Sequence, residues 1–166
     1  LHPTLRRQRQ MCIRDSARDL INRWRLVKKD PDAELSEPEQ PLVYWVENST
    51  PEEIRPFVVK GIEAWNKAFE KAGFKNAIVA KIQPDDAEWD AGDVRYNVVR
   101  WASTPSPRYS GYGPSVANPR TGEIIAADIV QEFNAIKRGY TYRKLWGYTE
   151  ENDPLEQWIV SLTMHC

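Results

Sequence analysis

Cysteine is almost absent from this chain, which has 166 residues and only two cysteines, Cys12 and Cys166, one near each end. Two cysteines so placed argue against a disulfide framework and leave the redox compartment undetermined. Long hydrophobic runs are missing as well, because no segment approaches the roughly 20 apolar residues that span a bilayer. The sequence therefore predicts no membrane span.

An excess of charge of one sign is also lacking, since the formal net charge is -1. Proteins that bind nucleic acid usually carry a basic excess, which releases counterions when they bind. We therefore expect no nucleic-acid partner. With 41% hydrophobic residues and seven Trp, the chain is long enough for one domain with a sizeable core.

Several catalytic motifs are missing: a glycine-rich phosphate loop, a Gly-x-Ser-x-Gly elbow and a Cys-x-x-Cys pair. Carboxylates are plentiful, but no pair of them stands out for acid–base catalysis. The densest acidic cluster lies in residues 83–93, where a solvated loop is favoured over a calcium site because the ligand spacing of an EF-hand is absent. Six aromatic residues could line a sugar or peptide groove, although such residues more often serve packing: Trp101, Tyr109, Tyr112, Tyr140, Tyr142 and Trp146.

The amino end falls into two parts. In residues 1–16, the stretch MCIRDS resembles the translation of a transposase tag used to prepare sequencing libraries, and the reverse complement of the tag also accounts for Cys166. We therefore expect a non-native segment there, with a basic tail or a targeting segment as the alternatives. Residues 17–41 turn polar, acidic and proline-bearing, which is typical of a linker or wrapping arm. The domain itself is expected over residues 42–165.

A strand, a helix and a second strand open this domain. Residues 42–46, LVYWV, form a β-branched and aromatic run that is typical of a buried strand. Residues 77–82, AIVAKI, predict a second strand, and the helix between the two predicts that they pair in parallel. A third strand is expected at residues 94–101, VRYNVVRW, followed by a loop over 102–113.

The helix is expected from residue 51 to its end at Gly73. Thr50 and Glu53 can form a capping box at its start. Pro56 lies beyond the first turn, so it should distort the helix or move its start downstream. The apolar stripe recurs at spacings of three and four: Ile54, Val58, Ile62, Trp65 and Phe69.

Two extended pieces follow, at residues 115–117 and 123–130, joined by a Pro-Arg-Thr-Gly turn. Residues 131–153 show weak periodicity and receive no assignment. A last helix begins after a cap at Asn152 or Asp153 and contains His165. On local evidence such a histidine is usually structural, because one imidazole cannot make a zinc site that needs three ligands.

The order of these elements gives His165 another interpretation. The most specific segments are RLVKKDPDAELSEP, GIEAWNKAFEKAGF, DVRYNVVRW and NPRTGEI, followed by a helix that ends LTMH. Together they resemble the upper catalytic subdomain of bacterial metzincin-like zinc metalloproteases, the EcxA-like group. The resemblance covers about residues 24–165. It implies an α+β fold: a twisted mixed β-sheet with an antiparallel edge strand, one long backing helix and the start of an active-site helix.

In that family the active-site helix carries His-Glu-x-x-His, whose two histidines bind one Zn²⁺ while the glutamate serves as general base. The resemblance places His165 at the first zinc ligand, and Cys166 stands where the glutamate belongs. It implies a partial catalytic domain of a zinc metalloendopeptidase, truncated one residue into its motif and inactive for that reason. It contributes no catalytic residue of its own. The resemblance also implies a protein that is periplasmic or extracellular.

The resemblance further gives a role to residues 112–117. In metzincins an antiparallel edge strand pairs with extended peptide substrate through main-chain hydrogen bonds. The expected substrate-binding residues are Tyr112, Gly113, Ser115, Val116 and Ala117.

Two alternatives stay open. The segment 112–117 can be an ordinary sheet edge that Pro114 and Pro119 blunt. The chain can also belong to another class, a non-catalytic peptide- or glycan-binding module in which His165 is incidental.

Overall fold

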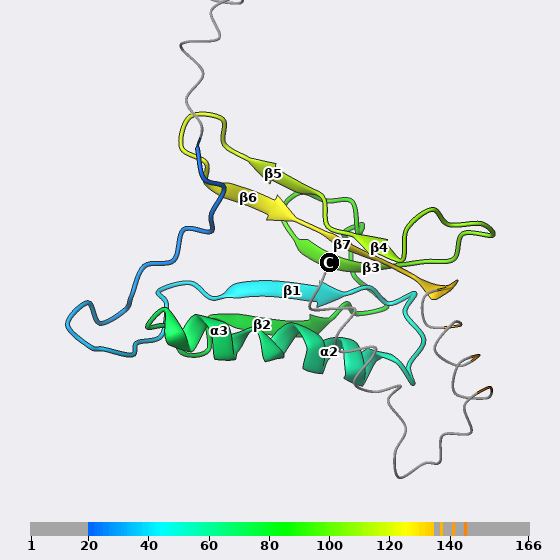
Figure 1. Cartoon of the computed structure of the whole chain (residues 1–166), viewed down its shortest axis with the longest axis horizontal. Coiled ribbons are helices and arrows are strands. Elements are labelled where there is room, and N and C mark those ends of the chain that lie inside the picture. The colour runs from blue at the N-terminus through cyan, green and yellow to red at the C-terminus, as the bar shows by residue number, and fades with distance from the viewer. Residues whose placement is uncertain (1–19, 135–136, 138–140, 142–144, 146–166) are drawn as a thin grey trace, which may run out of the picture.

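The computed structural model describes residues 20–134, 137, 141 and 145, and in this part the chain has a mixed α+β fold (Figure 1). A five-stranded sheet has the strand order β2-β1-β3-β7-β4, and a two-stranded sheet consists of β5 and β6. The strands are β1 (Leu42–Val46), β2 (Ile78–Ile82), β3 (Asn97–Ala102), β4 (Gly111–Tyr112), β5 (Ser115–Ala117), β6 (Ile124–Ala127) and β7 (Ile129–Glu132). The helices are α2 (Arg55–Ala64) and α3 (Asn66–Lys71).

The pairing within the large sheet is mixed. β1 pairs in parallel with both β2 and β3, and β3 pairs in parallel with β7. β4 pairs antiparallel with β7 at the end of the sheet. The predicted parallel pairing of the first two strands is therefore confirmed, and so is a mixed sheet with an antiparallel strand at its edge.

The helix predicted from residue 51 begins later and is divided in two. α2 begins at Arg55 with Pro56 in its first turn, which is the downstream start that the proline predicts. The predicted capping box is wrong, because the residue before the helix is Ile54, which has no side-chain acceptor. The carbonyl of Thr50 instead accepts a hydrogen bond from Nε of Arg55 at 2.8 Å. Trp65 separates α2 from α3, and Gly73 follows α3 with a φ of 87°, a conformation that favours glycine.

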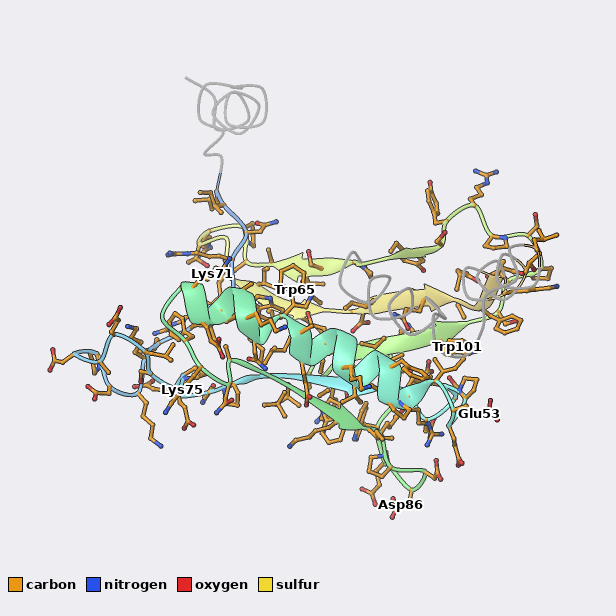
Figure 2. The ribbon with its side chains drawn as sticks, turned by 60° about the horizontal axis from the view of Figure 1, so that its bottom comes forward. Glu53, Trp65, Lys71, Lys75, Asp86 and Trp101 are labelled. Atoms are coloured by element: carbon orange, nitrogen blue, oxygen red, sulfur yellow. The ribbon has the colours of Figure 1, made fainter. Side chains whose placement is uncertain are left out.

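The core lies between this helical layer and the sheet. Figure 2 shows the layer running roughly along the direction of the strands, with Trp65 toward its Lys71 end. The first half of the predicted apolar stripe is buried, whereas Trp65 is 41% exposed and Phe69 is half-buried. The buried cluster combines helix and strand residues: Tyr44, Val46, Ile54, Val58, Ile62, Ile78 and Val99.

Two strand predictions need correction. The third strand begins at Asn97 rather than at residue 94, because the backbone N–H of Tyr96 bonds the carbonyl of Asp93 at 3.0 Å and closes a turn there. The piece predicted over 123–130 is divided into β6 and β7 at Asp128. There the Asp128 carboxylate accepts a hydrogen bond from the N–H of Val98 at 3.1 Å. The predicted turn between β5 and β6 is confirmed, because these strands pair antiparallel.

The described part of the amino-terminal segment, residues 20–41, contacts both the turn before β6 and the end of the helical layer. Arg23 exchanges backbone hydrogen bonds with the turn before β6, donating to Gly122 and accepting from Ile124 at 2.9 Å each. Ser36 donates its N–H to the carbonyl of Gly73 at 3.1 Å, at the end of α3. Among the described residues no helix is long and apolar enough to cross a membrane. The predicted last helix and His165 lie outside the described residues.

Candidate functional site

The predicted substrate-binding residues lie on the outer strand of a long hairpin, which we call the edge segment (residues 111–117). The structure divides it between β4 and β5, so the prediction of a loop through residue 113 is wrong at β4. The register does not change across the division: Tyr112 stands opposite Val130, and Ser115 stands opposite Ala127. The edge segment therefore behaves as one interrupted strand beside β6 and β7 (Figure 1).

The hydrogen bonds of this hairpin alternate along the edge segment. The N–H of Glu132 bonds the carbonyl of Ser110 at 3.1 Å, and the N–H of Asp128 bonds the carbonyl of Pro114 at 3.0 Å. Opposite residues of an antiparallel ladder alternate between hydrogen-bonded and non-hydrogen-bonded pairs. Every second residue from Ser110 to Pro114 therefore faces its partner strand. The residues that alternate with these direct their N–H and C=O groups away from the hairpin: Gly111, Gly113 and Ser115.

Pro114 consequently faces inward. Its carbonyl accepts from Asp128, and the N–H that proline lacks would have pointed the same way. The proline costs the hairpin one hydrogen bond but removes no donor from the outward row. Pro119 lies in the turn after β5, beyond the edge segment. No strand in the described part of the chain pairs with the outward side of β4 or β5. The blunting expected from the prolines therefore does not apply to this side.

Side chains of the edge segment are accessible. Tyr112 and Val116 are each 53% exposed, and the three residues between them are exposed as well. Ala117 is half-buried and lies at a register shift, where the uniform pairing ends. Because side chains alternate along a strand, Gly111, Gly113 and Ser115 share one face and Tyr112 and Val116 share the other. Four of the five predicted binding residues are thus exposed on one stretch of the edge.

A cavity of about 270 Å³ lies beside the edge segment. Gly113 contributes to its wall from the edge, Trp65 from the helical layer and Trp24 from the amino-terminal segment. The remaining lining residues come from α2, α3, four strands and the junction of β6 and β7: Leu42, Tyr44, Ile62, Phe69, Ile78, Ala127, Asp128 and Ile129. The sequence did not predict this cavity. Its one signal was Trp24, a large aromatic residue in a short amphipathic stretch that also contains Leu20, Ile21 and Leu26.

Two polar side chains, Tyr44 and Asp128, line this mainly apolar cavity. Tyr44 is 7% exposed, and its ring lies edge-on to that of Trp24 at 6.5 Å between centroids. Burial raises the pKa of the Tyr44 phenol to about 12, and the negative charge of Asp128 adds to the shift. The phenol is therefore neutral at physiological pH and faces the cavity as a polar but uncharged group.

Metal ligation cannot be assigned to the described residues. Among them, no group of three or more His, Cys, Asp or Glu side chains could hold a metal ion. His165, the predicted zinc ligand, lies outside them, and its role stays a prediction. In the acidic loop the Asp93 carboxylate bonds the Arg95 guanidinium, and these bonds lower the pKa of Asp93 to about 2.

The aromatic residues proposed for a groove are distributed differently. Trp101 packs against Phe133 at 6.0 Å between ring centroids, while Tyr109 and Tyr112 are exposed. Tyr140, Tyr142 and Trp146 lie outside the described residues. A cluster that the sequence did not predict forms elsewhere, where Trp89 stacks on Tyr96 at 4.0 Å and Trp45 meets both rings edge-on.

Comparison with protein-family models, with curated proteins and with solved structures found no match to this chain. Any functional inference therefore depends on the resemblance of its sequence segments and on the geometry of the edge segment and the cavity.

Proposed function

We propose that this chain is part of a zinc-dependent metalloendopeptidase of the metzincin-like kind, and that its edge segment binds extended peptide substrate. The observation that carries the proposal is the open row of main-chain groups at Gly111, Gly113 and Ser115. An extended peptide placed along this row gains directional hydrogen bonds without any rearrangement of the sheet. The antiparallel edge strand that the resemblance implies supports the same interpretation.

The contribution of this chain to catalysis is positioning. In such an enzyme His165 would be one of the residues that hold zinc, and the metal would supply Lewis-acid activation of the scissile carbonyl and of water. The edge segment holds the substrate backbone extended, which fixes its register relative to the rest of the enzyme. In the proposal His165 is the first metal ligand, and the chain carries no catalytic residue. The parent enzyme acts on peptides or proteins in the periplasm or outside the cell.

The coding sequence beyond residue 166, obtained from independent DNA, tests the proposal directly. We expect a glutamate codon in place of Cys166 and a histidine codon one helical turn after His165. A stop codon, or a continuation without that histidine, would contradict the peptidase assignment. The non-catalytic peptide- or glycan-binding module would then be the better interpretation, since it requires no metal site.

The chain as it stands should show neither peptidase activity nor tight zinc binding. His165 alone supplies too few ligands for a zinc site, and Cys166 in the place of the glutamate supplies no general base. Metal content after dialysis and cleavage of a denatured protein substrate measure the two properties. Binding of one Zn²⁺ per chain at neutral pH would show that other residues complete a site and would contradict the proposed ligand set.

A further inference from the structure

The cavity beside Gly113 bears on which peptides the edge segment selects. This inference depends on the proposed binding of peptide at the edge and adds a side-chain preference to it. Gly113 belongs both to the outward row of main-chain groups and to the wall of the cavity. A peptide that pairs with this row therefore passes directly beside the cavity.

The alternation of strand side chains determines which face of the peptide is involved. Residues opposite each other in a ladder carry their side chains on the same face of the sheet. Ile129 stands opposite Gly113 in the continuous register, packs against the core and lines the cavity. A peptide residue opposite Gly113 on the other side places its side chain on this same face. Glycine contributes no side chain there, so the path from the edge to the cavity is open.

The chemistry of the cavity favours one class of side chain. Four aromatic residues contribute to its wall, and they come from the amino-terminal segment, β1 and the helical layer: Trp24, Tyr44, Trp65 and Phe69. Rings prefer edge-to-face or offset contacts with other rings, so such a wall favours an aromatic guest. Asp128 disfavours an acidic guest by repulsion.

We infer that the cavity is a specificity pocket that receives an aromatic side chain from the peptide residue opposite Gly113. The pocket combines Gly113 at its edge, aromatic walls and the carboxylate of Asp128 at the junction of β6 and β7. A peptide with phenylalanine at this position binds more tightly than the same peptide with alanine, and a peptide with aspartate binds more weakly than both.

Fluorescence anisotropy tests this inference with short, labelled peptides that are identical except at one central residue and carry no other charged side chain. The full chain is titrated against the phenylalanine, alanine and aspartate peptides, and circular dichroism confirms that each variant is folded. Burial of the phenyl ring predicts about tenfold or greater preference for phenylalanine over alanine. Equal binding of all three peptides would overturn the pocket while leaving peptide binding at the edge intact.

Two variants with matched controls separate the pocket from the edge. Ala127→Leu fills the pocket and should abolish the phenylalanine preference without weakening the alanine peptide. Ala87→Leu, a half-buried alanine of the acidic loop that does not line the cavity, should change neither. Ser115→Pro removes an outward N–H and should weaken every peptide, whereas Ser115→Ala keeps that donor. Failure of all peptides to bind, or binding that Ser115→Pro leaves unchanged, would overturn the edge proposal itself.

Discussion

Asp128 is a residue whose position between two strands gives it several roles. Its main-chain N–H bonds Pro114 in the hairpin, and its carboxylate bonds the N–H of Val98 in β3. The carboxylate thus ties the hairpin to the large sheet at the point where β6 ends and β7 begins. The same charge acts on the buried Tyr44. Sequence alone did not single out Asp128, since it is one acidic residue in an apolar run.

Tyr44 gives a prediction on alkaline stability. Its pKa is about 12 in the folded chain and close to 10 when unfolded, so the folded state holds the proton more tightly. This contribution to stability is fully present below pH 10 and is lost as the pH rises toward 12. The loss amounts to roughly 2 to 3 kcal/mol. Urea unfolding of the wild type and of Tyr44→Phe at several pH values measures it, and an equal alkaline decline in both would contradict the assignment.

At the scale of elements, the sequence predicted the strands and the helix better than their ends. Strand periodicity located β1 and β2 to within one residue, and proline chemistry anticipated the late start of α2. The division at Asp128 depends on a hydrogen bond to a residue 30 positions away, which local patterns do not contain. For the candidate site, the edge segment was predictable from resemblance. The cavity was not, because its walls come from segments that only the fold brings together.

Asn66 forms hydrogen bonds with the β2 edge of the large sheet, which lies at the other end of the strand order from β4. Its side-chain amide donates to the carbonyl of Ile78 at 2.9 Å and accepts from the N–H of Ile78 at 3.1 Å. The neighbouring Ala77 bonds β1 through its carbonyl, so alternation directs the groups of Ile78 outward. The first residue of α3 thus satisfies the groups of Ile78 on the outer side of β2.

The substitution Asn66→Ala leaves both groups of Ile78 without this partner. We expect the free energy of unfolding to fall by about 1 to 3 kcal/mol. Lys67→Ala, at the next and exposed position of the same helix, should change it by less than about 0.5 kcal/mol. Chemical denaturation of the two variants provides the comparison. Equal effects would show that the paired hydrogen bonds of Asn66 contribute little to stability.

On the scale of the whole molecule, the two edges of the large sheet differ. The β2 edge has Asn66 bonded to Ile78 and an exposed lysine, Lys81, whose ammonium lies over the Trp45 ring at 5.3 Å from its centroid. The β4 edge continues into β5 with glycines, a serine and exposed apolar side chains. Natural sheets commonly protect their edges with charge or with a covering segment. The described chain has such protection at one edge and leaves the other open to another strand.

An open edge predicts association at high protein concentration. Val116→Lys places a charge on the edge segment and should lower the average mass in sedimentation velocity experiments over a range of concentrations. Val94→Lys is a matched control, because Val94 is 55% exposed and lies outside the edge segment. If the two variants sediment alike, association does not proceed through this edge.

The constant register on both sides of Gly113 and Pro114 limits how the length of this hairpin can vary. Deleting or inserting one residue at the interruption would turn the outward main-chain groups of the following residues inward, and the inward groups outward. Ser115 would then turn its N–H into the hairpin, and the inward groups would be offered to solvent. A change of two residues would restore the alternation. Functional relatives of this chain should therefore differ in this segment by even numbers of residues, or carry a compensating bulge.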